Sequence, residues 1–534
     1  MPLIQLLIVL FILFRTEDDL HKFQQNSYRF NRYLRWRFTV RSRIFRPHEL
    51  LFALGFGLTL LSNPYLKVLG VVMMLIDVYF FWLIKTAYPV KKKLVYTSRI
   101  KRLKFTTTLL LALLAMMGFY FENTIYIVFV SYYISFIYVF IGAVINAPIE
   151  YAINQHYYND AQETLRKAPN LTVIGITGSY GKTSTKNVLN QMLSKNFNTL
   201  MTPESFNTKM GLTRTIRQWL KPTHQILIAE MGAKETGDIK ELCDFVKPTM
   251  GIITSIGPQH LETFKTLENV IHTKGELFAS IPAGGSIFLN CDDENILKLP
   301  TRTDVKTYRY AVDSKNALDH DVHFTLESLK INSSGSTFDL IWAPDGLTSK
   351  DSIVRISLTT KLLGKHNLSN IVAGCAVAIS MGVSLQRLQN LVQAIEPIEH
   401  RLSYRRIADQ YTLLDDAFNS NPVGSSMALE VLKAFEGNKK IIITPGMIEL
   451  GETTEHYNQI FGEKIADACD EVILVGAKLT EPIQRGLKSK AYPERNIHIV
   501  KSIHEAYERL SSLVAYNDVV LIENDLPDSY NEAL

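Results

Sequence analysis

A short glycine turn between an apolar run and a helical pattern is the first stretch of this chain that suggests chemistry. Residues 176–185 read ITGSYGKTST; they follow LTVIG and precede KNVLNQMLSKN. A strand, a tight turn and a helix start present backbone N–H groups and a positive helix dipole to an anion. The generic phosphate loop reads G-x-x-x-x-G-K-[ST], but Ile176 stands five before Gly181 and the nearer glycine is Gly178. The stretch therefore predicts a shortened phosphate loop.

The residues of this loop have separate expected roles. Its glycines let backbone N–H groups close around phosphates, Lys182 would reach the outer phosphates, and the Thr183 hydroxyl would lie on Mg²⁺. The predicted nucleotide-binding residues of the loop are Gly178, Ser179, Tyr180, Gly181, Lys182, Thr183 and Ser184. This pattern predicts ATP and Mg²⁺ as cofactors.

Three charged or polar residues farther along could complete such a site. Glu230 ends the apolar run of LIAEMGA, where a second metal ligand would lie, and Mg²⁺ prefers oxygen ligands. His260 follows another expected strand end, and Lys274 lies in a helical pattern. Taken alone, His260 is also consistent with a packed or loop histidine, and Lys274 with a surface lysine.

The elements that must position these residues alternate between strands and helices. Strand-like runs LTVIGIT, QILIAEMG, MGIITSIG and GSIFLN are separated by helical patterns, which is typical of a parallel α/β sheet. Residues 302–362 predict added strands. After residue 396 a second α/β pattern, from QYTLLDDA to DVVLIEND, predicts a small doubly wound, Rossmann-like domain.

The first 150 residues are of a different kind. They hold 18 Lys and Arg against 7 Asp and Glu, whereas the rest of the chain holds 39 against 45. A uniformly basic nucleic-acid binder would not divide in this way, so we expect no nucleic-acid partner. The four cysteines, Cys243, Cys291, Cys375 and Cys469, are widely spaced, which favours reduced, buried thiols over a metal or disulfide framework.

Long apolar stretches in this basic segment predict a membrane region. Residues 51–62, 68–84, 105–121 and 125–145 pair as two hairpins with turns at SNPY (62–65) and ENT (122–124). Lys and Arg cluster at residues 15–48 and 85–104, and positive loops stay in the cytoplasm. We therefore expect a multi-pass protein of the cell membrane, in contact with its lipids, whose chain after residue 146 lies in the cytoplasm.

Two features of the membrane region leave alternatives open. The opening MPLIQLLIVLFILF is either a fifth, short crossing or an interfacial helix, so the region has four or five transmembrane helices. Asp77 lies inside a predicted crossing, where an ionisable group is by default a functional hypothesis; the alternative is that it pairs with a neighbouring helix's hydroxyl or snorkels.

The motifs taken together resemble one family. TGSYGKTSTK, TPESFNTKMG, AEMGA, HLETF…KGELF, GKHNLSN, EHR and LLDDAFNSNP follow one another in the order found in the Mur ligases of peptidoglycan synthesis, closest to the UDP-N-acetylmuramoyl-tripeptide–D-alanyl-D-alanine ligase branch. The resemblance covers residues 171–534. It implies a P-loop central domain at 171–395 and a C-terminal domain at 396–534, after a membrane region at 1–146 and a connector at 147–170.

The resemblance implies ATP-dependent amide ligation through an acyl phosphate. It assigns Lys182, Lys274, His260 and Asn207 to catalysis, and Thr183, Glu230, His260 and a carbamylated Lys274 to magnesium. It places Asn367 and Asn370 near the adenine, and Arg401 and Asp416 on the nucleotide when the domains close.

The chain departs from this family at its N-terminus, where the membrane segment takes the place of the domain that holds the UDP-sugar. We therefore expect a lipid-linked cell-envelope precursor as acceptor and an amino acid or short peptide as donor. Two alternatives stay open: the known UDP-linked reaction carried out by a membrane-anchored enzyme, and a membrane-tethered nucleotide-binding scaffold or ATPase.

Overall fold

The fold was analysed in a computed structural model of the 534-residue chain. It describes residues 2–26, 28–39, 46–87, 93–120, 124–259, 261–332, 335–349, 352–418, 420–448, 450 and 453–524. Contacts divide the chain into two compact units, residues 1–156 and residues 157–533.

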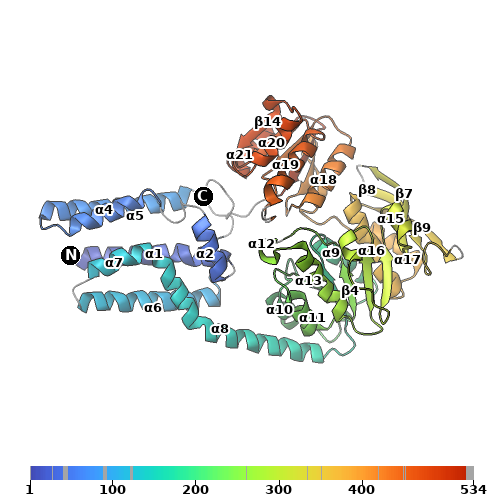
Figure 1. The fold of residues 1–534 in the computed structure, drawn as a ribbon, viewed down its shortest axis with the longest axis horizontal. Helices are drawn as coiled ribbons and strands as arrows, with labels where there is room; N and C mark the ends of the chain where they lie inside the picture. Colours follow the sequence, from blue (N-terminus) through green and yellow to red (C-terminus); the bar gives the residue numbers. More distant parts are fainter. Residues whose placement is uncertain are drawn as a thin grey trace. The chain divides into compact units, whose positions relative to one another are not determined.

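The first unit is helical (Figure 1). Its described helices are α1 (Pro2–Gln25), α2 (Phe30–Thr39), α4 (Glu49–Thr59), α5 (Pro64–Ala87), α6 (Ser98–Tyr120), α7 (Thr124–Tyr133) and α8 (Ser135–Arg166). Helices α4 and α5 form the first expected hairpin and approach closely at two glycines: a Cβ on Gly55 would lie 2.5 Å from the Gly70 carbonyl oxygen. The second expected turn, at 122–124, lies largely outside the described residues.

Among the described residues, two helices are long and apolar enough to cross a membrane: residues 64–84 in α5 and helix α8. The expected crossing at 125–145 is not one helix, because α7 ends at Tyr133 and α8 begins at Ser135. The hydrogen bonding changes there: the Ile137 N–H donates to the Ile134 carbonyl, one residue closer than in an α-helix. The expected connector at 147–170 is largely the continuation of α8, which runs through Pro148.

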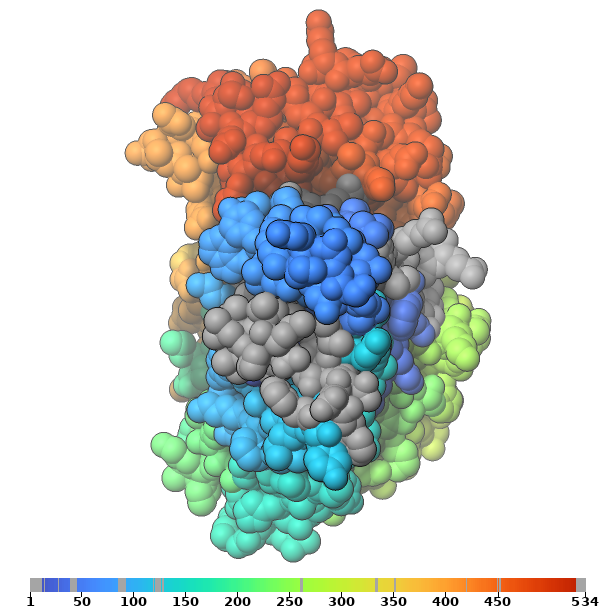
Figure 2. Space-filling view, turned by 90° about the vertical axis from the view of Figure 1, so that its left-hand side faces the viewer, coloured from blue at the N-terminus to red at the C-terminus, as the bar shows by residue number. Residues whose placement is uncertain are grey.

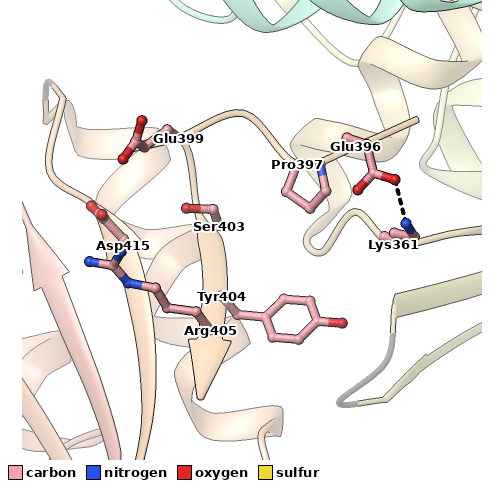
Figure 3. A pocket seen from close by; sticks show the side chains of 8 residues that line it. All are labelled: Lys361, Glu396, Pro397, Glu399, Ser403, Tyr404, Arg405 and Asp415. Atoms are coloured by element: carbon pink, nitrogen blue, oxygen red, sulfur yellow. Dashed lines mark hydrogen bonds and ion pairs between the residues drawn. The ribbon is translucent and has the colours of Figure 1, made fainter. Parts of the chain in front are cut away.

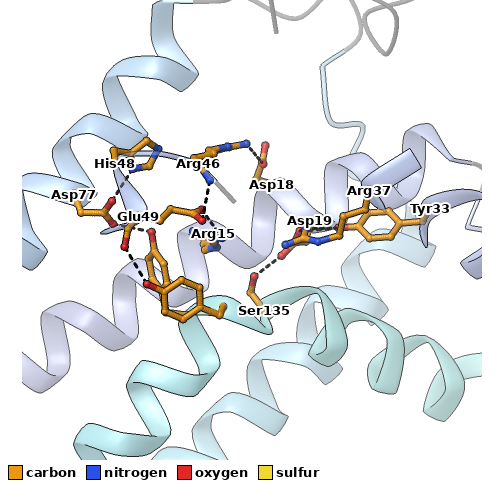
Figure 4. A network of polar contacts seen from close by, with 12 residues as sticks. Arg15, Asp18, Asp19, Tyr33, Arg37, Arg46, His48, Glu49, Asp77 and Ser135 are labelled. Carbon is orange, nitrogen blue, oxygen red and sulfur yellow. Dashed lines mark hydrogen bonds and ion pairs between the residues drawn. The ribbon is translucent and has the colours of Figure 1, made fainter. Parts of the chain in front are cut away.

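Polar side chains are buried between the helices of this unit (Figure 4). Asp77 on α5 is fully buried; one carboxylate oxygen lies 2.6 Å from His48 Nδ1, and the other accepts a 2.7 Å hydrogen bond from the Tyr132 hydroxyl on α7. Arg15 on α1 pairs with Glu49 on α4 at 2.8 Å. The Tyr132 contact is the pairing with a neighbouring helix's hydroxyl that stood as the alternative to a functional role for Asp77.

The second unit contains a nine-stranded sheet in the order β2-β3-β1-β4-β5-β6-β7-β8-β9. Its strands are β1 (Thr172–Thr177), β2 (Thr199–Met201), β3 (Ile226–Glu230), β4 (Met250–Ile253), β5 (Ser286–Asn290), β6 (Lys306–Tyr310), β7 (Phe324–Asn332), β8 (Gly335–Trp342) and β9 (Val354–Thr360). The pairs from β2 to β7 are parallel, and β8 and β9 add antiparallel strands, as the run at 302–362 predicts.

Helices cover both faces of this sheet because its central strands are apolar on both sides. One core contains side chains of α9 (Lys182–Leu193), α16 (Lys365–Ser380) and α17 (Leu385–Gln393). The other contains side chains of α10 (Lys209–Trp219), α11 (Asp238–Val246) and α13 (Leu267–Ser280). Short helices α12 (Leu261–Phe264), α14 (Glu294–Leu297) and α15 (Ser314–Asp319) complete this part.

The end of α8 packs into this second core. Ala161 is fully buried there, the Tyr158 and Phe245 rings lie 4.7 Å apart, and Arg217 on α10 pairs with Asp160 at 2.5 Å. The last turns of α8 are therefore a structural part of the second unit.

A six-stranded sheet follows in the order β10-β11-β15-β12-β13-β14 (orange and red in Figure 1). Its strands are β10 (Ser403–Ile407), β11 (Tyr411–Asp416), β12 (Lys440–Thr444), β13 (Glu471–Val475), β14 (Ile497–Val500) and β15 (Val519–Glu523). All pairs are parallel except β10 with β11. Helices α18 (Pro422–Ala434), α19 (Thr454–Ala466) and α20 (Glu481–Ser489) pack on one face, and α21 (Ile503–Leu513) on the other.

This arrangement confirms the expected mixed α/β fold with a doubly wound C-terminal part. All four cysteines are free and buried, as their spacing predicts. The boundaries at 146, 170 and 395 stay predictions.

Candidate active site

The phosphate loop lies where β1 ends and α9 begins, with Gly178 after the strand and Gly181 before the helix. Both glycines have positive φ, +151° and +80°. A Cβ on Gly178 would lie 2.1 Å from Thr254 Oγ1, at the end of β4. The local backbone therefore requires glycine at Gly178 for both conformation and space.

Two amides of this loop are already engaged. The Ser179 N–H donates to the Ser255 carbonyl at 2.7 Å, and the Tyr180 N–H donates to Ser255 Oγ at 3.1 Å. These two N–H groups thus have partners within the protein itself. The first turn of α9, where Lys182, Thr183 and Ser184 lie, has the N–H groups that a helix leaves without internal partners.

Lys182 is held against the loop that it is expected to serve. Its ammonium donates to the Gly178 carbonyl at 2.7 Å and to the Ser179 carbonyl at 3.2 Å. Burial lowers the pKa of Lys182 to about 8; nearby Glu230 opposes this shift and Arg401 adds to it. An incoming phosphate would stabilise the charged lysine.

Glu230, at the end of β3, is the centre of the site. The Thr183 hydroxyl donates to Glu230 Oε2 at 3.1 Å, and Asn207 Nδ2 donates to Oε1 at 3.1 Å. Asn207 is itself fixed, because its carbonyl accepts from the Gly232 N–H at 2.7 Å. The structure thus brings three predicted site residues, Thr183, Asn207 and Glu230, into direct contact.

Lys274 on α13 is buried, with only 2% of its surface exposed. Burial, together with the charge of Lys182, holds its pKa well below the ordinary value, although Asp238 and Glu276 oppose this shift. A buried lysine near other cations favours a neutral amine. The other residue of this predicted pair, His260, lies outside the described residues.

Asn367 and Asn370 lie on α16, next to the phosphate loop. Asn370 Oδ1 accepts a 2.7 Å hydrogen bond from Thr185 on α9. Asn367 instead donates to the Leu363 carbonyl, one turn earlier in its own segment. Of the two, Asn370 makes the direct contact with the loop's helix.

Arg401 and Asp416 come from the C-terminal sheet and the segment before it. The Arg401 guanidinium lies over the Phe418 ring, 4.0 Å from its centroid. Burial lowers the pKa of Arg401, while the negative charges of Asp416 and Glu230 oppose this shift. One arginine is therefore near a carboxylate from each sheet. The Asp416 carboxylate also accepts from the Leu402 N–H at 3.1 Å.

Three residues of this region do not stand out in the sequence. Lys186 on α9 lies 2.9 Å from Glu230 Oε2. His366 has a buried Nδ1 without a hydrogen-bond partner, and its pKa is lowered to about 4 by burial and by Arg401. Glu523 pairs in register with Asp416 and is fully buried. The position of Lys186 four residues after Lys182, on the same helix face, is the one signal that the sequence contains.

A pocket of about 410 Å³ is lined by residues that neighbour Arg401 and Asp416 in the sequence (Figure 3). Its lining residues are Lys361, Glu396, Pro397, Glu399, Ser403, Tyr404, Arg405 and Asp415. Lys361 and Glu396 form an ion pair on one side, and most of the other lining residues belong to the segment that enters the C-terminal sheet. The pocket contains none of the predicted site residues.

The residues of the cluster fit a nucleotide with a hard divalent cation. A hydroxyl and a carboxylate 3.1 Å apart are oxygen donors of the kind that Mg²⁺ prefers. Lys182, Lys186 and Arg401 gather around the carboxylate of Glu230, and Lys274 lies near Lys182, which suits a polyphosphate. Among the described residues, no three His, Cys, Asp or Glu side chains gather as a metal site.

Comparison of the sequence with known proteins finds similar ligases. The chain is 29% identical over 306 residues to the UDP-N-acetylmuramoyl-tripeptide–D-alanyl-D-alanine ligase of Escherichia coli K12, covering 57% of this chain and 64% of that protein. It is 28% identical over 341 residues to the same-named protein of Buchnera aphidicola, covering 64% and 70%. The match thus spans about two thirds of these relatives.

Solved structures share the fold. MurF from Acinetobacter baumannii matches with a TM-score of 0.61 at 21% identity, over 71% of this chain and 78% of that one. MurF from Thermotoga maritima in complex with ADP matches with a TM-score of 0.60 at 23% identity, over 71% and 82%.

Two family models match the second unit in sequence order. The Mur ligase middle domain matches residues 176–378, and the Mur ligase, glutamate ligase domain matches residues 400–523. Together they cover more than half of the chain and contain the phosphate loop, Glu230, Lys274 and Arg401. The chain belongs to the Mur ligase family.

Proposed function

We propose that this chain is an ATP-dependent ligase that forms an amide bond on a cell-wall precursor through an acyl phosphate. The observation that supports it best is that Thr183 and Asn207 both hydrogen-bond to the Glu230 carboxylate. Lys182 and Arg401 interact electrostatically with Glu230, and Lys274 interacts with Lys182. A carboxylate is a poor electrophile, and phosphorylation converts one of its oxygens into a leaving group. The new acyl phosphate then reacts with an amine, and inorganic phosphate leaves.

The residues have separate roles in this proposal. Lys182 and the first N–H groups of α9 hold the outer phosphates, where charge builds up during transfer. Thr183 and Glu230 would hold Mg²⁺, which would neutralise phosphate charge. Asn207 fixes the Glu230 carboxylate and lies beside the reacting groups. Arg401 and Asp416 would reach the nucleotide on closure and exclude water from the acyl phosphate.

Lys274 would act as a carbamate. The neutral amine adds to CO₂ and releases a proton, which gives an N-carboxylate in place of an ammonium. Its burial and lowered pKa support this, because only the neutral amine reacts. The modification would give the site a carboxylate in addition to that of Glu230, and His260 is proposed as a further ligand.

The first unit would place this chemistry at a membrane. Helices α4 and α5, whose hairpin is seen end-on in blue in Figure 2, carry exposed apolar side chains, among them Leu54, Val68, Val72, Ile76, Phe80 and Leu83. Such a surface favours contact with lipid acyl chains. We propose that the acceptor is a lipid-linked precursor at the cytoplasmic leaflet and that the donor is an amino acid or dipeptide, because anchoring raises the local concentration of a lipid-linked substrate.

A second candidate follows from the names of the relatives, which join D-alanyl-D-alanine to a UDP-linked muramoyl tripeptide. In that case the helices would only anchor the enzyme. A third, a nucleotide-binding scaffold, has no use for a buried lysine and carboxylate arranged around a phosphate loop.

The test is coupled turnover by the full-length protein in detergent or vesicles. Release of phosphate from ATP should require both a carboxylate acceptor and an amine, and should produce a new C–N bond. Mass spectrometry of lipid-linked precursors in cells with Lys182→Ala should show a species that lacks one residue or dipeptide. Lys195→Ala, an exposed lysine just after α9, is the matched control. Turnover with soluble UDP-muramoyl tripeptide at full rate would favour the second candidate, and turnover without an amine would favour an ATPase.

A further inference from the structure

Lys186 forms an ion pair with Glu230 Oε2, the carboxylate oxygen that would bind the proposed metal. Its ammonium lies 2.9 Å from Glu230 Oε2, which is also the oxygen that accepts from the Thr183 hydroxyl. Both side chains of the ion pair are buried, each with 1% exposed. A cation that enters between Thr183 and Glu230 therefore meets a carboxylate whose charge is already compensated.

Lys186 also connects three elements of the site. From α9 it reaches the end of β3 at Glu230, and it donates to the Glu204 carbonyl in the segment that leads to Asn207. Asn207 binds the other oxygen of the same carboxylate. The carboxylate is thus oriented and paired with a lysine before any ligand arrives.

The charges around Glu230 determine whether a divalent cation or a polyphosphate binds first. The affinity of an oxygen site for a divalent cation depends on the number of charged ligands. Here one described carboxylate is directly paired with Lys186 and is also surrounded by Lys182 and Arg401. A free divalent cation is therefore disfavoured, whereas a polyphosphate brings the negative charges that reverse the balance.

We propose that Lys186 is a positioning residue that makes metal binding depend on the nucleotide. In the empty site its ion pair with Glu230 competes with a metal ion, and when phosphates bind, their charge weakens this ion pair so that Glu230 can also bind the metal. The proposal rests on the nucleotide site of the proposed function, but not on which substrates are ligated. A lysine that only stabilised the fold would leave the metal affinity of the empty site unchanged when its charge is removed.

The test is Mn²⁺ binding followed by electron paramagnetic resonance, with full-length protein in detergent and no turnover. Wild-type protein should bind Mn²⁺ at least tenfold more weakly without ADP than with it, within the range of about 5- to 150-fold that is typical of coupled sites. Tight Mn²⁺ binding by wild-type protein without nucleotide would overturn the proposal, and this measurement needs no variant.

Variants identify the residue responsible. Lys186→Gln should bind Mn²⁺ at least tenfold more tightly without nucleotide and lose most of the dependence on ADP, whereas Lys186→Arg should behave like wild type. Lys195→Gln is the control, and thermal unfolding of each variant shows that it is folded. An unchanged Mn²⁺ affinity in folded Lys186→Gln would contradict the proposal. Coupled Mn²⁺ and ADP binding without ligation would instead leave the proposal intact and reject the proposed function.

Discussion

Lys182 is the residue at which charge matters most for the proposed reaction. Replacing it with Met should lower kcat about 10²- to 10³-fold, because loss of one preorganised charge in an enclosed site costs about 2.7–4 kcal/mol. The readout is ATP-dependent amide formation, with Lys195→Met as control. Equal rates in both variants would contradict the assigned role.

Lys274 offers a more specific prediction. Lys274→Ala should lose activity, and acetate or propionate should restore part of it, because a small carboxylate can occupy the space of the missing carbamate. The same acids should not stimulate wild-type protein or Lys182→Met. If Lys274→Ala keeps full activity without added acid, the carbamate has no role.

The carboxyl pair at the ends of β11 and β15 predicts a pH dependence of stability. Burial and the nearby Asp416 hold the pKa of Glu523 well above its ordinary value. The folded protein therefore binds a proton more tightly than the unfolded chain, and this contribution to stability, complete below pH 4, is lost as pH rises.

Glu523→Gln should raise the unfolding temperature at pH 8 and change it little at pH 4. Each unit of pKa shift is worth about 1.4 kcal/mol. The exposed Glu508→Gln should show no such trend.

Site residues that belong to a local sequence pattern were predictable from the sequence. Contacts between residues far apart in the sequence were not. Lys182, Thr183 and Glu230 could be predicted because each lies at a strand end or helix start. Lys186 could not, because its partner Glu230 is far away in sequence and only the parallel pairing of β1 with β3 brings them together. His366 and Glu523 also depend on partners distant in sequence: Arg401 acts on His366, and the pairing of β11 with β15 places Glu523 beside Asp416.

At the scale of elements, the turn between β1 and α9 is the part least tolerant of change. Gly178→Ala should lower ATP affinity at least tenfold, because a Cβ there meets Thr254 and the positive φ strains any L-residue. Gly237→Ala, where φ is also positive but the space is open, separates the two causes. It should cost about 1–2 kcal/mol of stability at most and leave ATP affinity unchanged.

The parallel strands were predictable because buried apolar runs alternate with helices, and so were the added strands after residue 302. The extent of α8 was not. Its sequence changes from apolar to polar near residue 147, which resembles the end of a helix. A helix can nevertheless continue where its neighbours change from apolar to polar. Likewise the apolar run at 125–145 gives no sign of the interruption at Ile134.

At the scale of the whole molecule, we predict that the chain is an integral membrane protein with its second unit in the cytoplasm. It should stay in the pellet after alkaline carbonate extraction. Protease added to inverted vesicles should remove the second unit, whereas protease added to intact, right-side-out vesicles should not. The opposite pattern would contradict the orientation given by the positive charges.

The His48–Asp77 contact also bears on how the chain is made. The two residues are 29 positions apart, and α4 with His48 is synthesised first. In the proposed topology, Asp77 of α5 meets His48 as soon as α5 leaves the ribosome, so both helices can enter the bilayer as a hydrogen-bonded pair. Tyr132 arrives later and completes the contact. Separating α4 from α5 by a long insertion should therefore trap nascent chains at the translocon.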